Sequence, residues 1–505
     1  MSHVNNKRLV KNTLFLYLRM LVVMAVGFYT TREILSLLGV VDYGIYNVVG
    51  GIVAMFSFVN GTLTTSSQRY FSIELAKGDL KRLNQWFCLN ITAFSIFIGI
   101  FLVVSETIGL WFVNTQLTIP EDRLFAANIV YQFSIITFCI HFYSIPYNAL
   151  IVAHERMSAF AYISIVEAFL KLAIVFLLSI ISWDKLIVYA FLMFLASLGI
   201  TLSYIFYDRR YFKESKYNLY WNKRECLELV SFSGWHLWGT FSMVIRSQGI
   251  NILINLFFNP AINAARAIAF QVYHAVSQLS SNFFVAVKPQ IYKCYADGNY
   301  ISLYKLVLRS TVMSSFLISI LVFPILSNTS YILGLWLSDI PDYTIIFTQL
   351  VLINGLIDAT NGPTAATVLA TGKIRKYELI VATCIVMNLP ISYVALKFGA
   401  DVTITMYTSI IISIVTTFNR SYIMCQQLNL SFRKYLFMFS RLVVASFVIC
   451  ILIYISIYNT DENFWSMMCQ SFFILLITIL SYLLIAFDND DTKYIMNIVK
   501  NKFKI

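Results

Sequence analysis

Long apolar segments alternate with short polar ones along the chain, from Leu14 to Phe487. Each apolar segment is about 20 residues or longer, the length that an α-helix needs to cross the hydrocarbon core of a bilayer. The pattern predicts an all-α polytopic membrane protein with fourteen transmembrane helices. We place them at about residues 12–38, 44–65, 86–110, 124–152, 160–181, 186–207, 229–258, 260–287, 303–327, 343–370, 376–398, 402–427, 436–458 and 464–487.

The composition supports a membrane location. Of the 505 residues, 59% are hydrophobic and only 12% are charged, whereas soluble chains carry about 25% charged residues. The first apolar segment is too long for a signal peptide and has no small-residue cleavage site, so we expect it to remain as the first helix. The net charge of +12 is spread over many short loops, and no nucleic-acid partner is needed to explain it.

The basic residues lie on one side of the predicted helices. With both termini in the cytoplasm, the inner connections hold 28 of the 37 Lys and Arg residues, and the outer connections hold three: Arg123, Lys185 and Lys397. This asymmetry follows the positive-inside rule and predicts cytoplasmic N- and C-termini. The outer connections are short, the longest being near Ser327–Tyr343, so we expect no catalytic domain on that side.

An internal repeat divides the chain into two blocks of six helices. At an offset of 220 residues, Leu37–Val40 falls on Phe257–Pro260, and Ala76–Asp79 falls on Ala296–Asn299. Because six is an even number, the two blocks share one topology and form a parallel repeat, with a central cavity between the lobes. The predicted domains are an N-lobe (1–210), a basic cytoplasmic linker (211–228), a C-lobe (229–430), two additional helices (431–487) and a basic cytoplasmic tail (488–505).

Polar and charged residues inside the predicted helices are the candidates for a binding site. Asn263, Arg266 and His274 share one face of the helix at 260–287, Asn251 follows a similar stripe on the helix before it, and Tyr46 lies on a polar face of the second helix. A charge at the bilayer centre costs about 3 kcal/mol even on lenient scales. The ionisable residues within the helices are Arg19, Arg32, Glu33, Glu167, Lys171, Arg246, Arg266, Asp358 and Arg420.

Six of these nine residues are basic, so an anionic substrate would compensate their charge. Structural roles compete with this hypothesis. Glu167 and Lys171 are four residues apart on one helix and favour a mutual ion pair. Arg246 and Arg266 lie on or beside polar stripes and favour a substrate-facing role, whereas for Arg19 both roles stay open. Asp358 is either an ion-coupling site or the structural partner of an arginine.

The first 80 residues contain four characteristic segments: Lys11–Thr13, Leu38–Tyr46, Gln68–Tyr70 and Ala76–Asp79. Together they resemble the start of Wzx-type O-antigen and capsular polysaccharide flippases, a branch of the multidrug/oligosaccharidyl-lipid/polysaccharide exporter superfamily. This resemblance implies two six-helix lobes, two extra helices and a cationic central cavity. It also implies ion-gradient-coupled alternating access that moves an undecaprenyl-pyrophosphate-linked oligosaccharide to the outer leaflet of the bacterial cytoplasmic membrane.

With this resemblance, we expect a non-enzymatic secondary transporter that works as a monomer, beside a polysaccharide polymerase and a chain-length regulator. The candidate substrate-binding residues are Arg19, Arg246, Arg266, Tyr46, His274 and Asn251, and the ion-coupling candidates are Asp358, Glu33 and Glu167. No nucleotide-binding or hydrolase motif and no metal-ligand spacing occurs, so we expect no cofactor, metal or catalytic residue. The alternatives are a cation-coupled multidrug exporter of the same superfamily and a lipid II flippase.

Overall fold

The computed structural model describes residues 6–54, 57–115, 119–258, 260–337, 340–457 and 464–488. These residues are nearly all helical and contain no strand. The chain divides into two compact units, Met1–Leu237 and Trp238–Ile505, with the boundary inside helix α8. The N-terminal unit holds α1 (Asn6–Ala54), α2 (Ser57–Lys77), α3 (Leu80–Val104), α4 (Leu110–Thr115), α5 (Leu124–Ala153), α6 (Met157–Ile180), α7 (Lys185–Tyr211) and the first part of α8 (Lys223–Phe257).

The C-terminal unit begins within α8 and ends with the two additional helices. Its elements are α9 (Pro260–Ala296), α10 (Tyr300–Ser327), α11 (Thr329–Trp336), α12 (Thr344–Asp358), α13 (Asn361–Thr371), α14 (Arg375–Val386), α15 (Asn388–Lys397), α16 (Ile404–Leu428), α17 (Phe432–Ile457) and α18 (Phe464–Ser481). A π-helical turn, Tyr482–Ala486, continues α18.

Each predicted span has a helical counterpart, with three differences in how the helices are broken or extended. The helix predicted at 44–65 is divided between two helices. Its first part is the end of α1, which follows a break at Gly39 (φ 76°), and its second part belongs to α2, which extends to Lys77. The span predicted at 343–370 is two helices, α12 and α13, that meet at a 41° bend. The span predicted at 376–398 is likewise divided into α14 and α15.

Eight described helices are long and apolar enough to cross a membrane, or nine if α12 and α13 together form one span. The helices α8, α9 and α16 are of sufficient length, at 35, 37 and 25 residues, but are not among them. The first two carry the polar stripes described above. The chain is therefore a multi-pass membrane protein.

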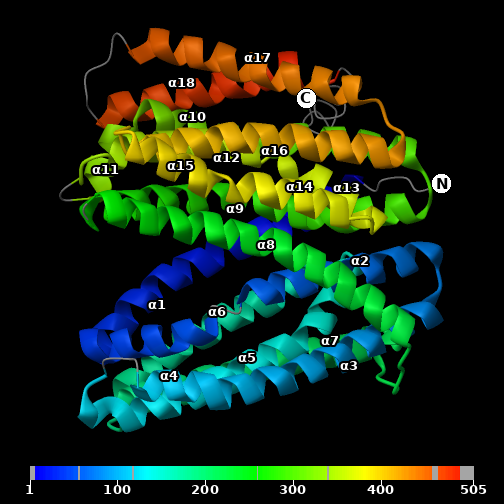
Figure 1. Cartoon of the computed structure of the whole chain (residues 1–505), viewed down its shortest axis with the longest axis vertical. Helices are drawn as coiled ribbons and strands as arrows, with labels where there is room; N and C mark the ends of the chain where they lie inside the picture. The colour runs from blue at the N-terminus through cyan, green and yellow to red at the C-terminus, as the bar shows by residue number, and fades with distance from the viewer. Residues whose placement is uncertain are drawn as a thin grey trace, which may run out of the picture. The chain divides into compact units, whose positions relative to one another are not determined.

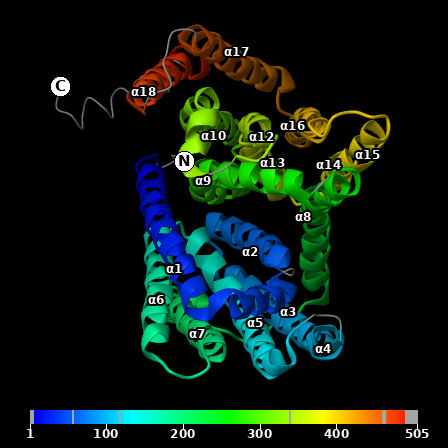
Figure 2. The same cartoon turned by 90° about the vertical axis from the view of Figure 1, so that its left-hand side faces the viewer.

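Within the N-terminal unit, α1 packs against α6, α6 against α7, and α5 against α2, α3 and α7 (Figure 2). One ion-pair network joins three connections at one end of this unit. Arg123, which precedes α5, binds Asp42 in α1 and Asp184, the N-cap of α7. These three residues are all predicted to lie on the outer side, so the structure confirms that they share one end of the unit.

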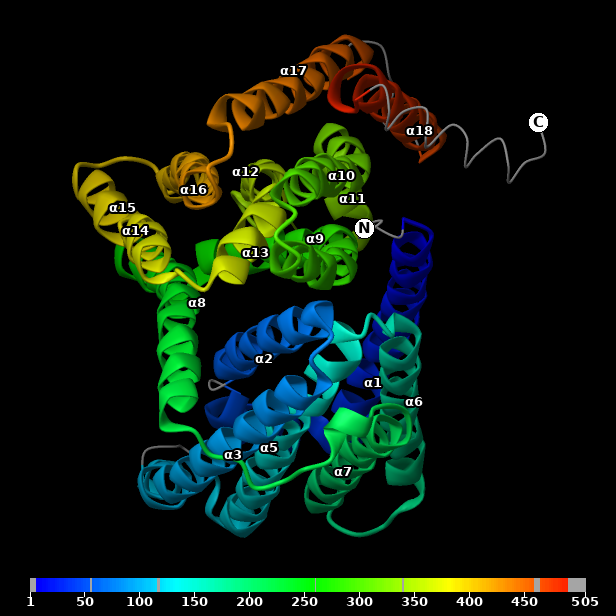
Figure 3. The ribbon, with the colours of Figure 1, turned by 90° about the vertical axis from the view of Figure 1, so that its right-hand side faces the viewer.

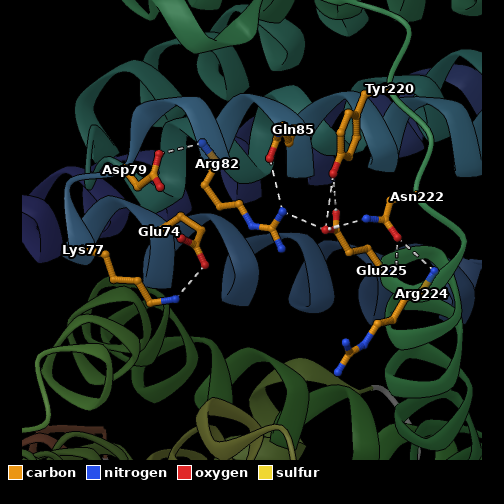
Figure 4. Close-up of polar contacts among 9 residues, drawn as sticks. All are labelled: Glu74, Lys77, Asp79, Arg82, Gln85, Tyr220, Asn222, Arg224 and Glu225. Carbon is orange, nitrogen blue, oxygen red and sulfur yellow. Dashed lines mark hydrogen bonds and ion pairs between the residues drawn. The ribbon is translucent and has the colours of Figure 1, made fainter.

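The predicted linker lies along α3 at the opposite end of this unit. Asn84 of α3 donates hydrogen bonds of 2.7 Å to the carbonyl oxygens of Glu214 and Lys216. Arg82 of α3 forms a 2.7 Å ion pair with Glu225 in the first turn of α8, and Asn222 also donates to that carboxylate (Figure 4). The linker and the start of α8 are thus fixed to the N-terminal unit by side chains of α3.

In the C-terminal unit, α9 packs against α10, α12 and α13, and α16 packs against α12, α13, α14 and α15 (Figure 3). The two additional helices, α17 and α18, lie side by side, and α18 contacts α10 (Figure 1). The hydroxyl of Tyr482, which follows α18, lies 2.8 Å from the hydroxyls of both Ser315 and Ser319 in α10. The additional helices are therefore attached to the outside of the C-terminal repeat.

The repeat found in the sequence forms the same turn twice. Gly78 and Gly298 both have left-handed backbones, with φ of 73° and 69°, which glycine adopts without steric cost. In each copy the residue directly after the glycine caps the next helix. Asp79 accepts from Arg82 N of α3 at 2.8 Å, and Asn299 accepts from Ser302 N of α10 at 3.1 Å. The two turns share their geometry and their capping chemistry.

Candidate functional site

The principal candidate is a buried arginine in the C-terminal unit. Arg266 of α9 is 6% exposed. One of its terminal nitrogens donates to Asn251 Oδ1 of α8, and its guanidinium carbon lies 4.4 Å from the centre of the Phe270 ring. Its Nε–H has no hydrogen-bond partner among the described residues. The charged group that acts on it electrostatically is Arg246, a like charge. No described carboxylate therefore balances the charge of Arg266.

Two asparagines hold this arginine between α8 and α9. Asn263, one turn before Arg266, donates a 3.0 Å hydrogen bond to the carbonyl oxygen of Asn251. The side-chain amide of Asn251 in turn donates to Gln248 at 3.2 Å. The amide oxygen of Asn263 is buried and has no hydrogen-bond partner within the described part of the chain. The site thus combines a fixed guanidinium with an unused acceptor.

A second polar group occupies the break between α12 and α13. Asp358, at the end of α12, accepts hydrogen bonds from Asn354 at 2.8 Å and from Asn361 at 3.4 Å. The amide oxygens of both asparagines are buried and make no hydrogen bond to described residues. Carboxylate and amide oxygens are the ligand types that hard cations prefer in proteins. The break is therefore a candidate ion site.

Tyr273 of α9 lies near both Arg246 and the break between α12 and α13. Its ring packs on Gly355 of α12, where an added Cβ atom would lie 2.5 Å from Tyr273 Cε2. Both Asp358 and Arg246 act on Tyr273 electrostatically. The structure thus brings together four predicted candidates of the C-terminal unit, namely Arg246, Asn251, Arg266 and Asp358.

The N-terminal unit contains a separate polar group around Arg19 of α1. The guanidinium carbon of Arg19 lies 4.7 Å from the centre of the Phe160 ring, and its Nε–H has no partner among the residues described. Glu167 and Tyr204 act on it electrostatically. Glu167 is itself paired with Lys171 at 2.7 Å, as the spacing predicts. Arg19 therefore shares its carboxylate neighbour with a lysine.

Three further predicted residues lie apart from these groups. Tyr46 packs on Tyr189, with ring centres 4.7 Å apart, near the start of α7; Arg19 lies near the start of α6, at the other end of the unit. His274 is exposed, beside the Phe270 ring. Glu33 is half-buried. The side chain of Arg32 lies outside the described residues.

Sequence reasoning missed Asn354, Asn361 and Tyr273. The signal for the asparagines was present, since they lie four residues before and three residues after Asp358, the separations at which helical side chains meet. Tyr273 carried no such signal, because a tyrosine in an apolar helix has the pattern of an ordinary packing residue. Its role depends on the close approach of α9 and α12.

No protein-family model and no curated protein matches this sequence. Solved structures do match it. The crystal structure of MATE in the bent conformation has a TM-score of 0.70 at 13% identity and covers 85% of this chain and 99% of its own. An outward-facing multidrug resistance MATE family transporter of the MOP superfamily has a TM-score of 0.69 at 12% identity, covering 83% and 96%.

A third match is a MOP superfamily transporter from Pyrococcus furiosus whose binding pocket is described as having reverse polarity, suggesting a different function. It has a TM-score of 0.68 at 12% identity and covers 83% of this chain and 97% of its own. At these identities the likeness concerns the fold. The matched region covers nearly the full length of each of these solved structures. The chain described here therefore has the fold of the MATE transporters of the MOP superfamily.

Proposed function

We propose that this protein is a secondary transporter that flips an undecaprenyl-pyrophosphate-linked oligosaccharide from the cytoplasmic to the outer leaflet. The observation that carries the proposal is the buried Arg266, whose charge no described carboxylate balances. A buried charge without a partner is costly, and an anionic ligand would offset that cost. The planar guanidinium binds two phosphate oxygens at once, which suits a pyrophosphate.

The surroundings of Arg266 support this role. Asn251 and Phe270 hold the guanidinium from two sides, so little conformational entropy is lost when a ligand binds. The free amide oxygen of Asn263 offers an acceptor for a sugar hydroxyl. Arg19, stacked on Phe160, is the cationic candidate of the N-terminal unit. The polyprenyl tail stays in the lipid, where its burial costs nothing.

Coupling to an ion gradient is assigned to Asp358. Its carboxylate and the two free amide oxygens of Asn354 and Asn361 form an oxygen-rich group at a broken helix, and broken helices bear the ion sites of many transporters. Glu167 is the weaker candidate because Lys171 neutralises it. Glu33 has no comparable group of oxygen donors around it among the described contacts.

Flipping in proteoliposomes tests the proposal. A fluorescent undecaprenyl-pyrophosphate oligosaccharide is reconstituted with wild type, Arg266→Gln, Arg246→Gln or the exposed control Arg224→Gln, under an imposed ion gradient. We expect gradient-dependent flipping by wild type and the control, and a loss of at least tenfold in the two variants, since about 1.4 kcal/mol of lost binding lowers affinity tenfold.

The same assay separates the alternatives. Uptake of an organic cation against protons or sodium, with no movement of the glycolipid, would replace this proposal by the multidrug exporter. Preferential flipping of lipid II would replace it by the peptidoglycan-precursor flippase. The bacterial cytoplasmic membrane, cytoplasmic termini, action as a monomer, and a polymerase and chain-length regulator as partners belong to the same proposal.

A further inference from the structure

Asp208 in the last turn of α7 is a fully buried carboxyl group. Its exposed fraction is 0%, and neither Oδ1 nor Oδ2 has a hydrogen-bond partner among the described residues. It belongs neither to the arginine group nor to the break at Asp358, which lies in the other unit. Burying a polar group without a hydrogen bond costs free energy, and burying an ionised carboxylate costs far more. Besides Asp358, the structure therefore contains a buried carboxyl group, that of Asp208, to which the proposed transport mechanism assigns no role.

The linker that follows Asp208 is fixed to the turn between α5 and α6 and to α3. Phe212 follows Asp208, with its backbone N–H donating 2.7 Å to the carbonyl oxygen of that residue. The ring of His154 stacks on Phe212 at 4.0 Å, and His154 Nε2 lies 2.6 Å from Glu214 Oε1. Asn84 of α3 holds the backbone of Glu214 in place. Asp208 is thus fully buried, and the segment that directly follows it is fastened at several points.

The electrostatic surroundings oppose a negative charge at Asp208. The charged group that acts on it is Glu214, another carboxylate. Asp208 lies near the C-terminal end of α7, and the covering His154 follows the C-terminal end of α5; helix C-termini carry partial negative charge. Other charged or titratable groups around this end of the unit include Tyr143 and the buried Tyr147 of α5, the buried Glu155, and Tyr204, Tyr207 and Tyr211 of α7. The side chains of Arg156, Arg209, Arg210 and Lys213 are exposed.

Two ligands could neutralise such a carboxylate, a metal cation or a proton. A hard metal cation takes about six oxygen ligands, and the Asp208 oxygens form no hydrogen bond with the described residues. Glu214, the nearest carboxylate that acts on Asp208, already binds His154. A proton needs no further ligand. The geometry therefore favours a proton over a metal cation.

We propose that Asp208 is an occluded proton-binding site, closed by Phe212 and the linker, which exchanges its proton only when the linker leaves α3. The 2.6 Å contact between His154 and Glu214 and the two Asn84 hydrogen bonds hold this cover in place. The site lies within the N-terminal unit alone and does not depend on which substrate is carried.

Thermal unfolding of the full-length protein in detergent, measured over a range of pH, tests this site. A carboxyl group that is protonated in the folded state and ionised in the unfolded state makes stability fall as pH rises. We expect Asp208→Asn to remove this part of the fall in melting temperature, and Asp297→Asn, a change at an exposed carboxyl in the turn between α9 and α10, to keep the wild-type profile. Parallel profiles for Asp208→Asn and wild type would overturn the proposal.

A second measurement keeps the proposal testable if Asp208→Asn does not fold. Infrared spectra of wild type at neutral pH should contain the C=O band of a buried protonated carboxylic acid that exchanges slowly in D₂O. The cover variant Asn84→Ala retains Asp208, and we expect it to exchange the same band faster. Absence of the slow band from wild type, or an unchanged exchange rate in Asn84→Ala, would contradict an occluded proton. Neither measurement requires a substrate, so the outcome is independent of the flipping assay.

Discussion

Arg123 binds Asp184 with 2.6 Å between Nη1 and Oδ2, and the same guanidinium also binds Asp42. The three residues come from α1, the turn before α5 and the N-cap of α7. Arg123 is one of three basic residues on the side predicted to be outer, and its two carboxylate partners explain why a positive charge is retained there. The network holds three helix ends together.

Replacing Arg123 by glutamine leaves two half-buried carboxylates without their cation. We expect a loss of about 1–3 kcal/mol in the free energy of unfolding, between the values for exposed and buried ion pairs. Melting in detergent checks this, with Arg210→Gln as the control because Arg210 is exposed at the other end of the unit. Equal melting temperatures for Arg123→Gln and the control would contradict the role of the network.

The pH dependence of this network has a defined sign. Partial burial alone would raise the pKa of Asp184, but hydrogen bonds from Arg123 and from the backbone N–H groups of Ile187 and Leu186 outweigh it and lower that pKa. A carboxyl with a lowered folded-state pKa contributes stability above its unfolded pKa, and this contribution is lost as pH falls through the folded value. We expect Asp184→Asn to show a smaller loss of melting temperature on acidification than wild type.

Gly355 is required by the ring of Tyr273. A methyl group there would lie 2.5 Å from Tyr273 Cε2 and 2.9 Å from Cδ2, so Gly355→Ala should cost about 1–3 kcal/mol as overpacking does. Gly199→Ala is the matched control, because an added Cβ at this helical glycine meets nothing within 4 Å. We expect the control to be neutral or slightly stabilising. Recovery of stability in Gly355→Ala with Tyr273→Leu would identify the contact responsible.

The N-caps Asp79 and Asn299 should contribute similar amounts to the free energy of unfolding. Asp79→Ala and Asn299→Ala each remove a side chain that accepts from the third helical N–H, and each should cost about 1 kcal/mol. Asp79→Asn should retain most of the stability because asparagine caps nearly as well. A cost for one alanine variant that exceeds the other by several-fold would show that tertiary contacts, and not capping, dominate at that turn.

Asp358→Asn tests the proposed ion site. The asparagine retains the size of the side chain but not its charge, so the fold should persist while gradient-driven transport is lost. We expect exchange of substrate without a gradient to continue, because Arg266 and Asn251 are unchanged. Asn354→Ala should weaken the dependence on the coupling ion and leave substrate affinity intact. Full gradient-driven transport by Asp358→Asn would exclude this residue from coupling.

The sequence predicts the helices well because a membrane requires long apolar segments, and these are readable directly. Pro363 and the polar residues from Asp358 to Asn361 permit a kink there, but the sequence does not predict two separate helices, because the 41° bend depends on packing against α9 and α16. The pairing of Arg266 with Asn251 follows from polar stripes on consecutive helices. Asp208 could not be foreseen, since it begins a basic segment that is typical of an exposed linker.

The turns at Gly78 and Gly298 also bear on how this protein arose. A left-handed glycine followed by a capping residue occurs at the corresponding place in both blocks. An ancestral six-helix protein that was duplicated and fused would leave this trace, because the backbone geometry restricts what can replace glycine while lipid-facing positions change freely. In this view, Asp79 and Asn299 descend from one ancestral residue. The two copies now differ in charge but form the same capping hydrogen bond.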